Sequence, residues 1–271
     1  MAVVDCPGFN DTKRSDTEVL GEIAKVLSSQ YLFSKKLRLR GILYLRDITK
    51  TRMEGSDVKT LNLFSKLVGK EAFPHVVFVT TMWGCLDAEG QKVAYKREKE
   101  LKEDFWREMI LEGSYVQRFE GTKDSAEGII GQLVGDADPV ILQIQHELID
   151  KELQLAATSA GSVLAPEVEE RLGASKNKIQ RFRARLARES NGTTKKRVLL
   201  DIEKAEKERD KAQSDKDKLE EKVGSNMKAK YKDAGNWQDN LRTICTVLGL
   251  GLTIVADVVL PLAGGTACDL M

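Results

Sequence analysis

The chain is poor in the residues that build metal centres and disulfide frameworks. It has four cysteines and two histidines in 271 residues, and the cysteines are scattered without a C-x-x-C pair. Cysteine pairs near histidines are typical ligands of structural zinc, and evenly paired cysteines staple small secreted domains. The absence of both patterns predicts reduced thiols in a cytoplasmic protein. His75 and His146 lie far apart in sequence, which argues against a histidine-based active site.

Aromatic residues are also scarce, whereas charged residues are plentiful. Aromatics make up 6% of the chain, which is low for a single compact domain, and charged residues make up 31%, which is high. The composition therefore favours a domain followed by an extension. The net charge is only +1, and acidic and basic residues look mixed rather than grouped. We therefore expect no nucleic-acid partner, and the start of the chain shows no signal-peptide pattern.

The most informative segment lies at the start of the sequence. A short apolar run leads into Asp5, and Gly8 follows three residues later, in D-C-P-G-F-N-D-T. In nucleotide triphosphatases this layout gives a carboxylate for Mg²⁺ at the end of a buried strand, and a glycine that lets a backbone N–H approach the terminal phosphate. The partner motif G-x-x-x-x-G-K-[ST] does not occur in the sequence. The segment is either half of a phosphate site, in a sequence that is a fragment, or a simple strand-to-loop turn.

Apolar runs alternate with amphipathic stretches through residues 1–138, which we take as the first domain. This alternation predicts an α/β fold with a doubly wound, mostly parallel sheet that is incomplete. Strands are expected at 2–4, 39–45, 75–81 and 115–119, the third of them almost wholly apolar and so buried on both faces. Helices are expected at 16–30, at 57–68 with Ser56 as N-cap, at 89–111 and at 125–134.

Ligands bind at the carboxyl ends of the strands in sheets of this kind. Asp5 and the segments 80–83 and 121–125 all lie at predicted strand ends. We therefore expect these three parts of the chain to converge in space and to form the candidate site.

The chain changes character after Pro139, and residues 139–233 are expected to form a charged helical extension. One helix is predicted at 140–155, and a highly charged stretch runs from 166 to 223. Within that stretch, apolar residues fit alternating spacings of four and three that Arg209 and Lys216 interrupt, a weak coiled-coil pattern: Val198, Ile202, Ala205, Ala212, Leu219 and Val223. A turn signal at 190–194 would fold two helices back on each other. A solvated helix or helical hairpin and a self-associating coiled coil both stay open.

Residues 234–271 form a hydrophobic C-terminal segment. The part from 244 to 263 is apolar apart from Thr246, Thr253 and Asp257, and it is long enough to cross a bilayer. Asp257 at the centre of a bilayer would cost about 2.5–3.5 kcal/mol on an insertion scale, although it lies nearer one end of the segment. The segment either contacts a membrane, packs on the helical region or another chain, or is a poorly ordered or out-of-frame tail.

Several segments, in the same order, resemble the AIG-type and septin-like members of the P-loop GTPases. D-C-P-G-F-N-D-T resembles their D-T-P-G-F-D-D-T segment, and the set as a whole is most like that of a group of fungal G-domain proteins. The further shared segments are K-R-S-D-T-E-V-L, G-I-L-Y-L-R-D-I leading to R-M-E-G-S, V-V-F-V-T-T-M-W-G and a G-T-x-x-S-A turn. The likeness is close over residues 1–155 and is one of composition only over 156–223.

The resemblance implies that guanine nucleotide, GTP or GDP, binds together with Mg²⁺. Asp5 would act on the Mg²⁺ through a water molecule, and Gly8 would sense the γ-phosphate. Residues 9–17 would be a switch that orders around the triphosphate and relaxes after hydrolysis. No catalytic residue is assigned.

The resemblance also implies where the base would be read. Thr81, Met82 and Trp83 would lie at the guanine position, and the other side of the base pocket would be formed by Thr122, Ser125 and Ala126. The usual N-K-x-D sequence is replaced by T-M-W-G, with Gly84 at the carboxylate position. Asp87 could take over that role only if the loop bends, Trp83 could stack on a base or pack as a lid on the core, and Ser125 also fits a helix N-cap.

The missing phosphate cradle would supply a lysine, a nest of backbone amides and one Mg²⁺ ligand. Lys13, Arg14 and Arg46 could attract phosphate, or could be solvated surface residues. We therefore expect slow GTP hydrolysis in the intact form and weak or absent nucleotide binding by this chain. The alternative is a non-catalytic pseudo-GTPase scaffold that acts through its helical or membrane-docking tail. The predicted partners are guanine nucleotide, a second copy through the helical extension, and a membrane through 244–263.

Overall fold

A computed structural model describes residues 2–11, 13–32, 38–134, 139–231 and 251–254, and its fold belongs to the α/β class. The main sheet is parallel and has the order β2–β3–β4, with β2 at Ile42–Asp47, β3 at Val76–Thr81 and β4 at Tyr115–Arg118. The predicted α/β class and the parallel pairing of these three strands are therefore confirmed.

The central strand β3 is buried on both faces, as its apolar sequence predicted. Successive residues of a strand point to opposite faces of the sheet. Val77 and Val79 form a cluster with residues of helix α5 (Lys123–Val134). Phe78 points to the other face and meets Phe64 of helix α2 (Gly55–Val68), with ring centroids 6.5 Å apart. Helices on both faces thus keep β3 away from water.

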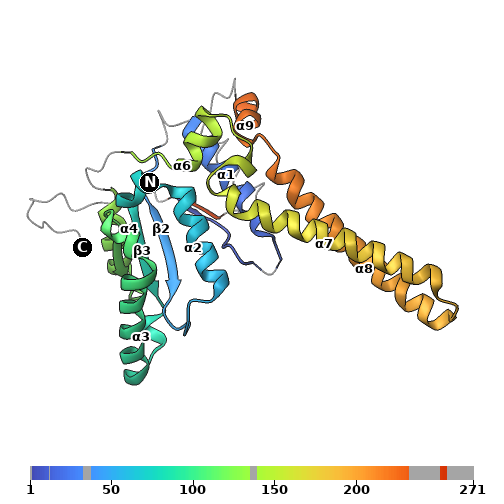
Figure 1. The fold of residues 1–271 in the computed structure, drawn as a ribbon. Coiled ribbons are helices and arrows are strands. Elements are labelled where there is room, and N and C mark those ends of the chain that lie inside the picture. Colours follow the sequence, from blue (N-terminus) through green and yellow to red (C-terminus); the bar gives the residue numbers. More distant parts are fainter. Residues whose placement is uncertain (1, 12, 33–37, 135–138, 232–250, 255–271) are drawn as a thin grey trace, which may run out of the picture.

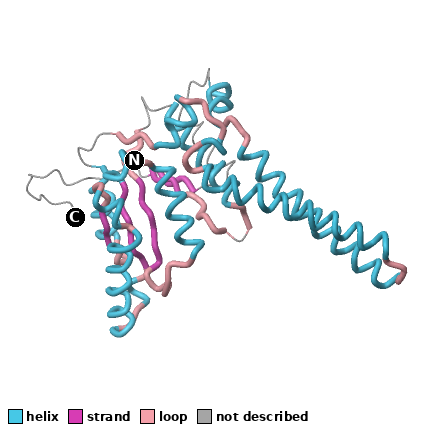
Figure 2. The backbone as a smooth tube through the Cα atoms, in the orientation of Figure 1, coloured by secondary structure: helices cyan, strands magenta, loops and turns pink. Residues whose placement is uncertain are grey.

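Strand β1 (Ala2–Asp5) is not part of this sheet, and the prediction of a buried strand there is wrong. It pairs antiparallel with β5 (Gly251–Ile254), so that Ala2 lies opposite Ile254 and Asp5 opposite Gly251. Figure 2 shows this short pair as a group separate from the three-stranded sheet. Val3 is exposed, because a two-stranded ribbon covers neither of its own faces.

The helices before and after β3 follow the sequence pattern with three differences. Helix α1 (Asp16–Leu32) and helix α2 occur as predicted, but the N-cap of α2 is Glu54 rather than Ser56. The predicted helix 89–111 consists of α3 (Ala88–Glu100), the π-helical turn η3 (Leu101–Phe105) and α4 (Arg107–Leu111). The π-turn brings Trp106 into the core, where its ring stacks on Phe78 at 4.5 Å. Helix α5 begins at Lys123, two residues before its predicted start.

The prediction of a single helix at 140–155 is wrong. The segment contains three short turns: α6 (Gln143–Gln145), the π-turn η4 (His146–Asp150) and η5 (Leu155–Ala157). The helical part runs without a break from Gln143 to Asp150, and it ends before Glu152, whose backbone is left-handed with a φ of 51°. Within it, the side chain of Gln145 is fully buried. Its amide donates to the Leu27 carbonyl and to Gln30 on α1 and accepts from the Leu142 backbone, which holds the chain against α1.

The charged extension is an antiparallel helical hairpin of α7 (Gly161–Arg188) and α8 (Gly192–Leu219), followed by α9 (Val223–Tyr231). The turn predicted at 190–194 is confirmed, and Asn191 caps α8 by accepting from the backbone of Thr193 and Thr194. The apolar seam residues predicted on α8 from Val198 to Leu219 lie buried in the hairpin together with buried residues of α7: Val168, Leu172 and Ile179. Figure 1 shows the hairpin projecting away from the body that holds the sheet.

One hydrophobic cluster joins the sheet, α1, α2 and the base of the hairpin. It extends from Val19 on α1 to Leu164 and Val168 on α7 and to Leu219 and Met227 near the end of the described chain. The predicted domain boundaries after 138 and after 233 lie outside the described residues.

Most of the predicted C-terminal segment also lies outside the described residues. Of the stretch 244–263, only 251–254 is described, as β5. Among the helices that the structure describes, none is both long enough and apolar enough to cross a membrane. Cys6 and Cys85 are exposed.

Candidate functional site

Two of the three predicted site segments come together at the carboxyl ends of β3 and β4. Thr80 lies opposite Arg118 in the parallel register, and the Phe119 N–H donates to the Thr80 carbonyl oxygen over 2.9 Å. The segment that begins with Thr81 and the segment that leads to Thr122 therefore leave the sheet at the same edge.

The loop after β3 turns Trp83 inward. Met82 adopts a left-handed backbone conformation with a φ of 66° and leaves its side chain half exposed. Trp83 is buried, and its indole Nε1 donates to Thr80 Oγ1 over 3.0 Å. Of the two roles open to Trp83, the structure shows the lid on the core. Asp87 caps α3 by accepting from the Gly90 N–H at 2.7 Å, so its carboxylate is committed to its own helix.

The loop after β4 is likewise committed to the start of a helix. Thr122 Oγ1 accepts from the Ser125 N–H at 3.2 Å, so the capping residue of α5 is Thr122 and not Ser125. The Ser125 hydroxyl donates to the Thr122 carbonyl at 2.9 Å and accepts from the Glu120 N–H at 3.3 Å. The Ala126 N–H donates to the same Thr122 carbonyl. These contacts order the loop at the start of α5.

A cluster that the sequence analysis missed fills the space between the two loops. The Arg118 guanidinium lies over the rings of Trp83 and Tyr95, at 4.5 and 4.7 Å from the ring centroids. It also forms a two-pronged ion pair with Glu98 on α3: Nε to Oε1 at 2.9 Å and Nη2 to Oε2 at 2.5 Å. Lys102 adds a contact to Glu98 at 3.2 Å. We call these five residues the Arg118 cluster.

The Arg118 cluster is built to keep both members of the ion pair charged. Glu98 is only 3% exposed, and burial alone would raise its pKa. The hydrogen bonds and charges of Arg118 and Lys102 outweigh burial, so the pKa of Glu98 falls below its ordinary value. The hydrogen bond to Glu98 raises the pKa of Arg118 in turn. Glu98 is therefore an ionised, fully partnered carboxylate and not a poised base.

Asp5 and Gly8 do not join this site. We predicted that they would converge with the two loops because all three segments would follow strands of one sheet. That premise is wrong, since β1 lies outside the three-stranded sheet. Asp5 is exposed, and a Cβ added to Gly8 would meet no atom within 4 Å. No group of three or more Asp, Glu, His or Cys residues within the described chain could hold a metal ion. One exposed carboxylate does not fit a resident Mg²⁺ site, because Mg²⁺ needs further oxygen ligands.

Two of the three basic residues considered for phosphate are engaged elsewhere. Arg14 pairs with Glu22 at 2.9 Å. Arg46 is buried, pairs with Asp57 at 3.0 Å and donates to the Arg52 carbonyl. Lys13 is exposed. Arg14 and Arg46 therefore already have carboxylate partners within the fold.

The loop after Gly8 has a different set of partners, on the helical hairpin. The Ser15 hydroxyl donates to Asp215 Oδ1 on α8 over 2.6 Å. The other oxygen of Asp215 accepts from Arg171 Nη2 on α7 at 2.8 Å, and the carboxylate is buried. We call Ser15, Asp215 and Arg171 the latch. It joins the segment 9–17, which the resemblance marks as a switch, to both helices of the hairpin.

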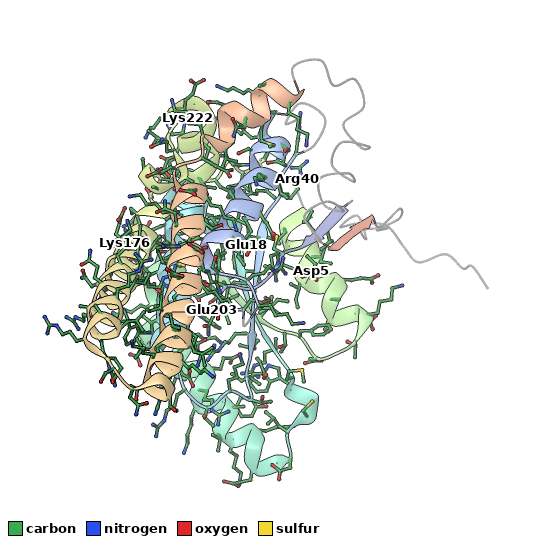
Figure 3. All side chains as sticks on the ribbon, turned by 90° about the vertical axis from the view of Figure 1, so that its right-hand side faces the viewer. Asp5, Glu18, Arg40, Lys176, Glu203 and Lys222 are labelled. Atoms are coloured by element: carbon green, nitrogen blue, oxygen red, sulfur yellow. The ribbon has the colours of Figure 1, made fainter. Side chains whose placement is uncertain are left out.

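Three further ion pairs flank the latch. Lys59 on α2 bridges Asp16, at 3.2 Å, and Glu167 on α7. Lys218 on α8 pairs with Glu18 on α1 at 3.4 Å. Figure 3 labels Glu18 on α1, the helix that begins where the loop ends. No sequence pattern links these residues, because the partners lie up to 200 residues apart.

Comparison with protein-family models, with curated proteins and with solved structures finds no match to this chain. The likeness to G-domain proteins therefore depends on the sequence segments alone.

Proposed function

We propose that this chain is a non-catalytic scaffold of the pseudo-GTPase kind, in which the loop after Gly8 sets the position of the α7–α8 hairpin. The main support is the hydrogen bond from Ser15 to the buried carboxylate of Asp215. Removing a hydrogen-bond partner from a buried carboxylate costs free energy. This cost couples the position of the loop to the position of the hairpin.

The Arg118 cluster supports the non-catalytic part of the proposal. Its ion pair lies beside Trp83, one of the residues that the resemblance assigns to reading the base. Asp87, the carboxylate considered for reading guanine, caps α3. A nucleotide would have to displace contacts that already satisfy every charged group in the cluster.

The loop can act as a switch without nucleotide chemistry. Anything that binds residues 9–17 and pulls Ser15 away would leave Asp215 with Arg171 alone. The hairpin would then be less firmly held to α1. Couplings of this kind between two sites are commonly worth about 1–3 kcal/mol.

Hydrogen exchange of the full chain tests this function. Asp215→Asn keeps the shape of the side chain but removes the charge that Arg171 and Ser15 share. We expect faster exchange at residues 13–19 and at the base of the hairpin. Asp210→Asn, on the same helix but paired only with the adjacent Arg209, is the matched control and should change neither region. Equal exchange in both variants would refute the coupling.

A second candidate function is GTP binding with Mg²⁺, with slow hydrolysis. It is favoured by the parallel order β2–β3–β4, which brings the loops after β3 and β4 to one edge of the sheet. Titration with a fluorescent GTP analogue separates the two functions. Saturable binding that needs Mg²⁺ and is lost in Asp5→Asn would support the nucleotide function, whereas the scaffold predicts no such binding.

A further inference from the structure

The outer end of the hairpin carries a block of positive charge that the overall composition conceals. Between residues 176 and 197 the chain has nine lysines and arginines and one acidic residue, Glu189, a net charge of +8. The whole chain has a net charge of +1, so the remaining residues carry −7. The prediction that charges are mixed along the chain is therefore wrong for this segment.

These cations are concentrated in space as well as in sequence. With a rise of 1.5 Å per residue, the block covers about the last 18 Å of α7 and the first turns of α8. Lys178 and Arg183 pair with Glu208 and Glu206 of α8. The other seven form no ion pair with any residue in the described ranges, and all of them are exposed. Figure 3 looks toward the hairpin and shows its side chains fanning outward, with Lys176 labelled.

Three of the arginines share one face of α7. Arg181, Arg185 and Arg188 are spaced four and three residues apart, and they line an open hollow together with Ala184 and Glu189. Guanidinium groups grouped in this way suit phosphate oxygens, which accept two parallel hydrogen bonds from each.

Two large apolar side chains lie beside the charge. Leu199 and Leu200 lie on α8 one residue beyond the K-K-R run at 195–197, from which Val198 separates them, and they are 52% and 58% exposed. The buried seam of the hairpin uses Val198 and Ile202 instead, so neither leucine is needed to hold α7 and α8 together. Adjacent basic and apolar side chains at the end of a projecting element suit a bilayer surface, where the cations meet headgroups and the leucines enter the interface.

We propose that residues 176–200, the hairpin tip, bind anionic phospholipids at a membrane surface. Nucleic acid is the less suitable anion, because the only aromatic residue between 176 and 200 is Phe182, which is half-buried, and the tip offers no stacking surface. The negative remainder of the chain would face away from the lipid. This inference does not depend on the latch or on nucleotide binding.

Co-sedimentation of the full chain with vesicles tests the proposal. At moderate salt we expect binding to vesicles of phosphatidylcholine with phosphatidylserine and none to phosphatidylcholine alone. Each basic residue near an anionic surface contributes about fivefold to partitioning. The triple variant Arg181→Gln, Arg185→Gln, Arg188→Gln should therefore weaken binding by about a hundredfold, and Leu199→Ser with Leu200→Ser should weaken the binding that survives at high salt.

The matched control removes the same charge nearer the body, in Lys204→Gln, Lys207→Gln, Lys211→Gln on α8. Its binding should stay within about fivefold of the wild type. Equal loss in both triple variants, equal binding to neutral and anionic vesicles, or no binding to either would overturn the proposal. So would tighter binding to single-stranded DNA than to anionic vesicles in the same buffer. Circular dichroism should show the same helix content in all variants. Normal vesicle binding by the Arg181, Arg185 and Arg188 triple variant would also contradict the proposal.

Discussion

Ser15 and Asp215 are 200 residues apart in sequence and are joined by a hydrogen bond of 2.6 Å. Asp215 is also paired with Arg171, so one buried carboxylate connects the loop after Gly8 with both helices of the hairpin. The hairpin is therefore not a free appendage. It contacts a loop that sequence resemblance marks as a switch, and we propose that its position depends on the conformation of that loop.

The energy of this connection is measurable by a double-mutant cycle. We expect Asp215→Ala to lower the free energy of unfolding by about 3 kcal/mol, because Arg171 keeps a charge without its partner. Ser15→Ala should cost about 1–2 kcal/mol, since it removes both this bond and the cap that Ser15 gives to the Glu18 N–H. The coupling between them should be about 1 kcal/mol. Urea unfolding of the four proteins gives these values, and strictly additive effects would contradict the latch.

The Glu98–Arg118 pair predicts how stability responds to acid. The folded-state pKa of Glu98 lies below its ordinary value, so its ionised form stabilises the fold above about pH 4.3, the value of a free glutamate. That contribution is lost as the pH falls through the lower, folded-state pKa. Glu98→Gln should therefore cost about 1–2 kcal/mol at pH 7 and progressively less below pH 4. Urea unfolding at both pH values checks this, and a pH-independent difference would be evidence against an ionised pair.

Substitution of Gly8 tests how closely the D-C-P-G-F-N-D-T segment is packed. A Cβ at this position would meet nothing within 4 Å, and the backbone is not left-handed. Gly8→Ala should change the free energy of unfolding by no more than about 0.5 kcal/mol. The contrast is Gly224→Ala, whose Cβ would lie 2.0 Å from the Leu148 carbonyl oxygen and should cost more than about 2 kcal/mol. A large loss at Gly8 would show that the segment is packed more closely than described.

The hairpin seam predicts that α7 and α8 pair within one chain. The apolar positions that suggested a coiled coil, such as Val198, Ile202 and Ala205, are already buried. Self-association through the seam would require the hairpin to open. We therefore expect a monomer in sedimentation-velocity experiments at micromolar concentration. A dimer that dissociates in Ile202→Ser would instead mean that the seam is shared between copies.

The elements that could be predicted from the sequence are those whose own residues carry the signal. The wholly apolar run of β3, the periodicity of α1 and the Asn191-Gly192 turn each carry their own signal. The expected helix at 140–155 is cut short before Glu152, whose left-handed backbone periodicity cannot reveal. The strand predicted at 2–4 is present as β1, but its predicted burial was wrong because it pairs with β5, about 250 residues away, outside the parallel sheet.

The candidate site was harder to predict, because its contacts join different elements. The segments after β3 and β4 could be placed at one edge of the sheet, but Tyr95 and Glu98 on α3 gave no sign that they would meet Arg118. The basic block of the hairpin tip was visible in the sequence, as nine cations in 22 residues. The overall charge of +1 concealed it, because acidic residues elsewhere balance it.

The central claim is that the loop after Gly8 holds the hairpin in place, and the distance between hairpin and body tests it most directly. Spin labels at Ser190→Cys, at the end of the hairpin, and at Asn62→Cys, on α2, would report that distance in a background with the four native cysteines replaced by serine. We predict one narrow distance distribution, which Asp215→Ala broadens or shifts and Asp210→Ala leaves unchanged. An identical narrow distribution in Asp215→Ala would contradict the account.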